Sequence, residues 1–293
     1  MLKSPEDKNR IALFVTQWIF AALLITLLAM NSQVIGLGGD WQLTYGHLKA
    51  NWLNPYQPSL LTNPNPFTNP PWLIFLFPQV LLPLSVGSLV NRAITIILIV
   101  LVIQKYKAGW RDLIIVATSL PFLDIIWNNN VDAVLFLAIL LPSQYKSYGI
   151  PILLLKPQVI SSIALIWWRQ FKFKPHFFLP LIAVFLLSFL IWGIWPAQLP
   201  GVKNATEVPW NVSIWPYGIP VGLGLLFFAY KQPDQDFTAE VLAAISTCFL
   251  VPYLASYSLI VPFTLLAVRY KTISILVSVL FWVYFITVGI ILL

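Results

Sequence analysis

The sequence predicts an all-α integral membrane protein: a polytopic bundle of transmembrane helices with a long loop after the first one. Hydrophobic residues make up 59% of the 293 residues and charged residues 9%, whereas soluble domains carry about 25% charged residues. Residues 11–30 and 272–293 contain no charge, and a helix that crosses a bilayer needs roughly 20 apolar residues. These runs are continuous, unlike the alternating strands of about 10 residues in a β-barrel. Residues 1–293 are interpreted as a single domain.

Hydropathy along the chain predicts about eleven membrane segments, several of them short or broken. The predicted segments are residues 11–30, 89–103, 113–126, 131–141, 150–155, 159–168, 177–195, 214–230, 237–254, 257–268 and 272–293. Residues 71–84 are interrupted by Pro78 and Pro83, so we expect them to lie partly in the outer interface. Short or broken helices at membrane depth normally line a cavity buried in protein.

The distribution of basic residues predicts which loops are cytoplasmic, since Lys and Arg accumulate in cytoplasmic loops. With a cytoplasmic N-terminus, four of the 17 Lys and Arg residues lie outside and 13 lie inside. The four outer residues are Lys49, Arg92, Lys156 and Lys203. The net charge of +7 is therefore attributed to membrane topology, and no nucleic-acid partner is expected.

Residues 31–88 form the predicted first extracytoplasmic loop and its interfacial helices. Within it, Trp41, Tyr45, Leu48 and Trp52 recur at near-helical spacing. They form one apolar stripe, which is typical of an amphipathic helix lying in the membrane interface.

Asp40 precedes that stripe and follows Gly38 and Gly39. Rare ionisable residues in a membrane protein are functional candidates. Two compatible interpretations stay open: Asp40 is the N-cap of the helix, or it is a catalytic carboxylate.

Other polar residues expected on the outer side fall into a turn and two isolated cations. The turn contains Asp124, Trp127, residues 128–130 and Asp132, which either bind a hydroxyl-rich ligand or form an ordinary hairpin turn. Lys156 interrupts an apolar hairpin and requires a partner, either a phosphate or an acidic side chain. Arg92 begins a span, and it either snorkels to the interface or binds an anion.

No metal site or cofactor is expected. His47 and His176 are too few and too far apart in sequence for a metal site, and the single cysteine, Cys248, cannot form an intrachain disulfide. Cys248 is interpreted as a small buried residue.

Six short motifs, in order along the chain, resemble the GT-C superfamily of membrane glycosyltransferases. The arrangement is most similar to the bacterial polyprenol-phosphate-mannose-dependent α-mannosyltransferases, over residues 11–268. The motifs are Gly39-Asp40-Trp41 with Tyr45, Asn54-Pro55-Tyr56, the FTNPPW segment at 67–72, Lys156-Pro157-Gln158, Asn211-Val212-Ser213, and Pro252-Tyr253 with Tyr257. The family often has Gly-Gln at the turn formed here by residues 128–130, and Asp where this chain has Ser258; the chain also looks short at its C-terminal end.

The resemblance implies transfer of mannose or a similar hexose from a polyprenyl-phosphate donor to a lipid or glycan acceptor hydroxyl, in the envelope of a bacterial cell. Asp40 would be the general base for that hydroxyl. Lys156, and secondly Arg92, would stabilise charge on the leaving phosphate, and direct displacement would invert the anomeric carbon. The remaining residues expected to bind substrate are Tyr45, His47, Tyr56, Trp72, Asp124, Asn128, Asn130, Asp132, Gln158, Tyr253 and Tyr257.

Two other functional classes are compatible with the sequence. Broken helices and a buried Lys also suit a transporter or flippase of a lipid-linked or small polar solute, although no internal repeat is evident. The third class is a catalytically inactive relative that acts as a scaffold. The long loop with Asp40 and its aromatic residues favours the enzyme.

Overall fold

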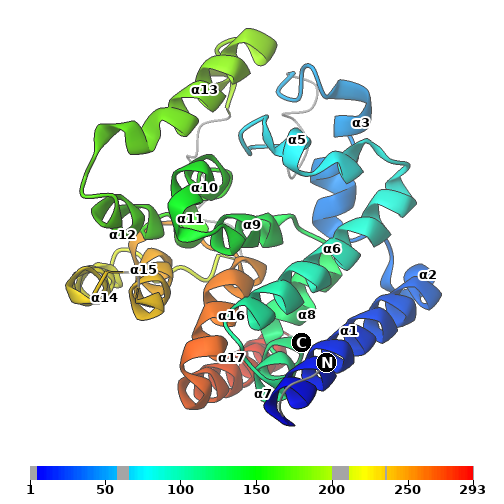
Figure 1. The fold of residues 1–293 in the computed structure, drawn as a ribbon. Coiled ribbons are helices and arrows are strands. Elements are labelled where there is room, and N and C mark those ends of the chain that lie inside the picture. Colours follow the sequence, from blue (N-terminus) through cyan, green and yellow to red (C-terminus); the bar gives the residue numbers. More distant parts are fainter. Residues whose placement is uncertain (1–4, 58–65, 200–210, 235, 293) are drawn as a thin grey trace.

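The structure, a computed structural model, describes residues 5–57, 66–199, 211–234 and 236–292, and within them the side chains of residues 9–287. This described part of the chain is helical, and its only extended pairing is an isolated bridge between Asn211 and Ala255. The elements are α1 (Pro5–Met30), α2 (Ser32–Ile35), η1 (Trp41–Tyr45), α3 (Leu48–Asn51), α5 (Leu73–Leu76), η2 (Pro78–Leu81), α6 (Leu84–Lys105), α7 (Trp110–Ala117), α8 (Leu120–Asn128), η3 (Asp132–Val134), α9 (Leu135–Leu140), η4 (Ser143–Tyr145), α10 (Lys146–Leu153), α11 (Pro157–Ile160), α12 (Ile163–Gln170), η5 (Pro175–Phe178), α13 (Leu179–Trp192), η6 (Trp195–Gln198), α14 (Ile219–Lys231), α15 (Phe237–Leu250), η8 (Ser256–Leu259), α16 (Ile260–Arg269) and α17 (Lys271–Leu292) (Figure 1).

Three helical stretches are long and apolar enough to cross a membrane: Asn9–Met30, Leu84–Lys105 and Pro175–Trp192. Helix α8 and the η3–α9 segment meet at a bend of 114°. Counted together as one span, they make a fourth stretch of this kind. The prediction of an all-α protein with transmembrane helices is confirmed to this extent. The remaining predicted segments coincide with shorter helices, so the count of eleven stays a prediction.

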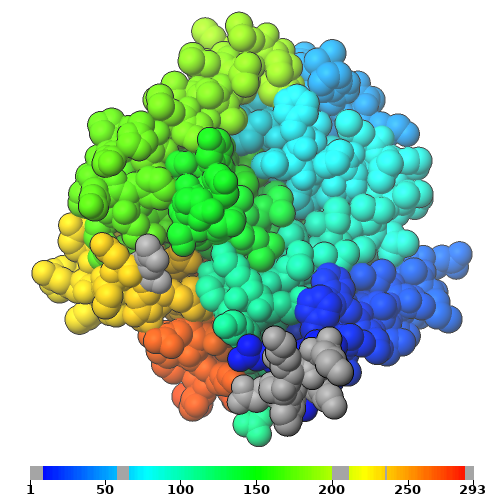
Figure 2. Space-filling model, viewed as in Figure 1, coloured from blue at the N-terminus to red at the C-terminus, as the bar shows by residue number. Residues whose placement is uncertain are grey.

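Two of these spans have the exposure expected of helices that face lipid. Only 17% of the apolar window of α1, and 17% of that of Pro175–Trp192, is buried in the protein. In the view of Figure 2 these two segments lie at opposite margins, α1 in blue at the lower right and α13 in yellow-green at the top. By contrast, 61% of the apolar window of α6 is buried, and α6 packs against α1, α9 and η2, so it is the most buried of the three stretches.

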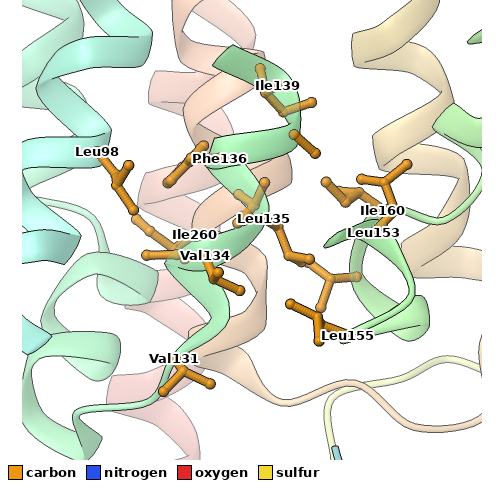
Figure 3. Close-up of a cluster of buried hydrophobic side chains, with 14 of the residues drawn as sticks. Leu98, Val131, Val134, Leu135, Phe136, Ile139, Leu153, Leu155, Ile160 and Ile260 are labelled. Carbon is orange, nitrogen blue, oxygen red and sulfur yellow. The ribbon is translucent and has the colours of Figure 1, made fainter. Parts of the chain in front are cut away.

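The apolar centre of the molecule surrounds α9, which is only six residues long. Figure 3 shows side chains from this helix and its neighbours meeting in one cluster. The labelled members are Leu98, Val131, Val134, Leu135, Phe136, Ile139, Leu153, Leu155, Ile160 and Ile260, each less than 5% exposed. A layer of apolar side chains therefore separates the polar groups at the two ends of α9.

The first long loop departs from the expected amphipathic helix. Instead of one continuous helix, residues 41–52 form the π-helical turn η1 and the short helix α3. Trp41, Tyr45 and Leu48 are each 1% exposed, while Trp52 is 37% exposed. The indole Nε1 of Trp41 donates to the backbone oxygen of Leu84 at 3.0 Å. The prediction of an interfacial stripe is therefore wrong for three of its four residues, because these side chains are covered by protein and not by lipid.

Residues 71–84 also form separate short pieces, α5 and η2, as the two prolines dictate. Pro78 lacks a backbone N–H and opens η2, and Pro83 precedes α6; proline inside a helix removes a hydrogen bond and clashes with the preceding turn. As a result α6 begins at Leu84, five residues before the predicted start of that span.

The predicted break at Lys156-Pro157-Gln158 is confirmed. Helix α10 ends at Leu153 and α11 begins at Pro157. Lys156 lies between them with φ −141° and ψ 72°, outside the helical region, because a residue before proline is driven away from helical angles. The break places the Lys156 side chain beside the polar turn between α8 and η3.

Candidate functional site

Asn130 is the centre of a buried polar group that joins four segments of the chain. Its Nδ2 donates to Asp40 Oδ2 at 2.6 Å. Its Oδ1 accepts from the Lys156 ammonium at 3.2 Å and lies 3.4 Å from the Tyr45 hydroxyl. Because burial raises the pKa of Tyr45, that hydroxyl stays protonated and acts as a donor. We call Asp40, Tyr45, Asn130, Asp132, Lys156 and Ser258 the outer polar cluster.

Lys156 and Asp132 form a buried ion pair within this cluster. Their Nζ and Oδ1 atoms are 2.7 Å apart, and the Asp132 side chain is fully buried. The Ser258 hydroxyl donates to the other Asp132 oxygen, and the Lys156 ammonium lies 5.9 Å from the centre of the Tyr257 ring. Of the two partners that the sequence allowed for Lys156, the structure provides the acidic side chain, so a phosphate would have to share Lys156 with Asp132.

Glycine at position 38 allows Asp40 to reach this cluster. Gly38 has φ +91°, and a Cβ atom there would lie 2.4 Å from the Asn129 Cβ and 2.7 Å from the Asn128 backbone oxygen. A side chain at position 38 would therefore push the Asp40 segment away from the turn. Asp40 itself makes no side-chain capping hydrogen bond, so capping does not explain its position.

A network of amides beneath the outer polar cluster was not anticipated from the sequence. Asn129 adopts left-handed angles at the end of α8, and its Nδ2 donates to the Ser88 hydroxyl at 2.9 Å and to the Leu37 backbone oxygen at 3.1 Å. Asn91 donates to Asn129 Oδ1 at 2.9 Å and accepts from Gln79 at 3.2 Å. These bonds fix the polar turn to α6 and so fix Asn130.

The signal for this network was present in the sequence of α6. Ser88, Asn91 and Arg92 have the spacing i, i+3, i+4 in a largely apolar helix, and such positions share one helix face. All three are buried, with exposures of 2% or less. A buried polar face on a transmembrane helix indicates polar partners inside the protein.

Arg92 neither snorkels to the interface nor forms an ion pair with any described residue. Its Nε donates to the Ile126 backbone oxygen at 2.9 Å, and its Nη1 donates to the Gly36 backbone oxygen at 3.0 Å and to the Ser88 hydroxyl at 3.2 Å. Ile126 lies in the last turn of α8, where the helix dipole favours a cation. Arg92 thus ties α8, α6 and the segment before Asp40 together, while its buried Nη2 has no hydrogen-bond partner among the described residues.

A group of aromatic side chains connects the FTNPPW segment to the helix break at Lys156. We call this group, Tyr45, Tyr56, Phe67 and Trp72, the aromatic wall. The Tyr56 hydroxyl donates to the Asn69 backbone oxygen at 2.5 Å, and Asn69 Nδ2 donates to the Leu155 backbone oxygen at 3.1 Å. Trp72 Nε1 donates to the Pro151 backbone oxygen at 3.1 Å. Ring contacts then link Tyr45 to Phe67 at 6.3 Å and Phe67 to Tyr56 at 5.7 Å. Tyr56 and Trp72 therefore hold α10 and the residue before Lys156 in place from outside.

The other predicted site residues lie outside the outer polar cluster. Asp124 accepts from Asn128 Nδ2 at 2.5 Å within α8 and from the Ser256 hydroxyl, which joins α8 to η8. His47 is exposed, and Gln158 and Tyr253 are partly exposed. Lys203, one of the four predicted outer basic residues, is not among the described residues.

A second buried ion pair, also missed in the sequence, lies at the opposite end of α9. Lys146 Nζ is 3.2 Å from Glu240 Oε1, and Glu240 also accepts from Trp167 Nε1 at 2.7 Å and from the Tyr106 hydroxyl at 3.2 Å. Lys105 Nζ donates to the Ile139 backbone oxygen at 2.5 Å. Glu240 is a lone acid in the apolar helix α15, and that isolation was the available signal. We call Tyr106, Lys146, Trp167 and Glu240 the inner polar cluster.

The chemistry available in the outer polar cluster is that of a carboxylate beside a hydrogen-bonded cation. No group of three or more His, Cys, Asp or Glu side chains within the described ranges could hold a metal ion. Asp40 is 8% exposed and Lys156 is 9% exposed, so both are held inside the protein with a small accessible surface. Asp40 could accept a proton, and the cation could attract a phosphate.

Comparison with known proteins found no matching family model and no significant similarity to a curated protein or a solved structure.

Proposed function

We propose that this chain is an integral membrane glycosyltransferase that uses a polyprenyl-phosphate sugar as donor. It would transfer mannose or a similar hexose to a lipid or glycan hydroxyl on the extracytoplasmic side, with inversion. The observation that supports it is the bridge through Asn130, which holds the Asp40 carboxylate at 2.6 Å from one end of its amide and the Lys156 ammonium at 3.2 Å from the other. The motif order of the sequence supports the family, and the geometry supports the pairing of a base with a cation.

In the proposed reaction, Asp40 takes the proton from the acceptor hydroxyl as that oxygen attacks the anomeric carbon. The bond from the anomeric carbon to the phosphate oxygen breaks, and the lipid phosphate leaves with the electron pair. General bases of this kind contribute about 10²–10⁴-fold to rate. Lys156 would stabilise the departing phosphate while remaining paired with Asp132, and the aromatic wall would exclude water from the sugar.

The proposed topology places the outer polar cluster on the extracytoplasmic side of a bacterial plasma membrane. It has a cytoplasmic N-terminus and about eleven membrane segments. The shortest among them are largely buried within the protein. The arrangement of basic residues supports it: Lys105 and Lys146 both donate to the Ile139 backbone oxygen, at the end of α9 opposite to Asp132. One end of α9 thus carries the loops assigned to the cytoplasm and the other carries Asp40.

The decisive experiment is Asp40→Asn in the purified full-length protein. Polyprenyl-phosphate mannose is the donor, a lipid extract of the native membrane supplies the acceptor, and released polyprenyl phosphate is measured. Asn keeps the size of Asp and its oxygen can still accept from Asn130, so the fold should persist. Without a proton acceptor, turnover should fall about 10²–10⁴-fold.

The matched control is Asp234→Asn, because the Asp234 side chain is 73% exposed and, among the described residues, forms an ion pair with Arg169 alone, at 3.4 Å. It should leave turnover unchanged. Near-normal turnover of Asp40→Asn would make Asp40 a structural residue and would remove the main reason to regard the chain as an enzyme.

A transporter or flippase is the second candidate, and two observations favour it. The α8 and η3–α9 segments are bent by 114°, as in a re-entrant loop, and buried ion pairs lie on both sides of the short apolar layer around α9. Under this alternative the wild-type protein consumes no donor in the assay above, and Asp40→Asn gives the same result as the wild type.

A further inference from the structure

A polar cavity of about 730 Å³ lies between the turn after α9 and the turn that joins α12 to η5. It shares no residue with the outer polar cluster. The lining side chains that matter here are Ser143, Gln144, Gln170, Lys172, Lys174 and His176. The cavity combines three basic side chains with neutral hydrogen-bonding groups.

The charge of this cavity is not balanced by the protein. None of the lining residues is acidic, and neither lysine forms an ion pair with a described residue. The nearby acid Asp234 is already paired with Arg169 at 3.4 Å. Two lysines within three residues, facing a polar cavity with no acid, favour an anion there.

The turn that presents the lysines is held in place by its own aromatic residues. Lys172 and Phe173 have φ of 53° and 55°, a left-handed conformation that is costly for residues other than glycine. The Phe173 ring packs on Trp168 at 5.0 Å, and the Phe171 ring packs on Phe177 at 4.9 Å. These contacts hold the backbone in its unusual form, so Lys172 and Lys174 keep their positions beside the cavity.

The position of the cavity along the membrane identifies the kind of anion. The span Pro175–Trp192 begins directly after Lys174, and only 17% of its apolar window is buried. Its exposed side chains include Leu179 at 58%, Ile182 at 50%, Leu186 at 59% and Leu190 at 82%. If this helix crosses the membrane, as its length and exposure indicate, the cavity at its end lies at the depth of the phospholipid headgroups.

We propose that this cavity binds the phosphate-bearing headgroup of an anionic phospholipid. Lys172 and Lys174 neutralise the phosphate, Ser143, Gln144 and Gln170 bind the polar remainder of the headgroup, and the acyl chains lie along the exposed face of α13. Basic pockets between membrane helices are a recognised way to hold such headgroups. The site is independent of the proposed transfer reaction.

Native mass spectrometry of the full-length protein in mild detergent tests the proposal. The probes are dioctanoyl phosphatidylglycerol, dioctanoyl phosphatidylcholine and inorganic phosphate. The wild type should bind phosphatidylglycerol in preference to phosphatidylcholine. Each lysine near the headgroups should contribute about fivefold in affinity, so Lys172→Gln/Lys174→Gln should bind about 25-fold more weakly.

Two further variants distinguish a defined site from general charge attraction. Lys107→Gln/Lys231→Gln removes the same charge from exposed positions that do not line the cavity and should bind as the wild type does. Lys172→Arg/Lys174→Arg should retain binding, and thermal unfolding of each variant checks its fold. The proposal fails if the glutamine variant binds normally or if the control variant loses as much affinity. It also fails if inorganic phosphate displaces the lipid at equal concentration, because that result would indicate a site for soluble anions.

Discussion

The buried ion pair between Lys156 and Asp132 provides the sharpest test of the outer polar cluster. The two charges are 2.7 Å apart, Asp132 is fully buried and Lys156 is 10% exposed at its side chain. Replacing Lys156 by Met keeps the length and the apolar part of the side chain but removes the cation. Asp132 would then be a buried carboxylate whose remaining partner is the hydroxyl of Ser258.

The size of the effect follows from the cost of an uncompensated buried charge. Removing one partner of a buried pair costs about 3–5 kcal/mol. Each 1 kcal/mol lowers the Tm of a larger domain by about 2–4 °C, so Lys156→Met should lower the Tm by roughly 6–20 °C. The double variant Lys156→Met/Asp132→Asn carries no unpaired charge, and its amide oxygen can still accept from Ser258. It should therefore recover most of the loss.

The measurement is thermal unfolding of the purified variants in one detergent, followed by tryptophan fluorescence. Asp234→Asn is the control, since an exposed pair such as Arg169–Asp234 contributes about 0–1 kcal/mol. An unchanged Tm in Lys156→Met, or a double variant as unstable as the single one, would refute the assignment of Lys156–Asp132 as a buried, mutually dependent pair.

The double variant also separates structure from chemistry. If it is stable but inactive in donor consumption, the Lys156–Asp132 pair has a role in the reaction as well as in stability. If it is stable and fully active, Lys156 only compensates Asp132, and the cation for the phosphate has to come from elsewhere, with Arg92 the next candidate.

Two further predictions concern the loop that carries Asp40 and the topology. Gly38→Ala should destabilise the protein by about 1–3 kcal/mol through backbone strain, and further through the clash with Asn129. Gly36 is the control: it has φ +69° and no atom within 4 Å of a Cβ placed there, so Gly36→Ala should show the strain alone. Equal losses of Tm in the two variants would contradict the close approach at Gly38. In a Cys248→Ala background, Lys49→Cys should react with an impermeant maleimide on intact cells and Lys107→Cys only after permeabilisation, and external labelling of Lys107→Cys would overturn the proposed topology.

Local sequence patterns predicted the features that depend on local physics. The uncharged run at residues 11–30 predicted a span because the backbone in lipid has to form its hydrogen bonds within the helix. Pro157 predicted the break before α11 because it restricts the residue that precedes it. The structure has a helix over Asn9–Met30 that is long and apolar enough to cross a membrane, and Lys156 adopts non-helical angles before α11.

Other features depend on which surface covers a segment, and local patterns do not encode that. The stripe of Trp41, Tyr45 and Leu48 was correctly recognised as apolar, yet an apolar face is equally satisfied by lipid and by protein. The contact between Asp40 and Asn130 joins residues 90 positions apart. Both residues were expected on the outer side, Asp40 in the first loop and Asn130 in a polar turn, but the hydrogen bond itself results from the packing of the first loop on the α8–η3 turn.

The cost of opening the apolar layer around α9 is an argument for the proposed transferase over the proposed transporter. A transport path between the outer and inner polar clusters would have to open the apolar layer around α9, which at about 1.5 Å per residue is only some 9 Å long. If such an opening separated Lys156–Asp132 or Lys146–Glu240, it would cost about 3–5 kcal/mol for each broken pair, and a transported solute would have to offset that cost in every cycle. Sugar transfer on one side of the membrane requires no such opening. The Asn130 bridge can keep Asp40 and Lys156 in place while donor and acceptor exchange at the outer surface.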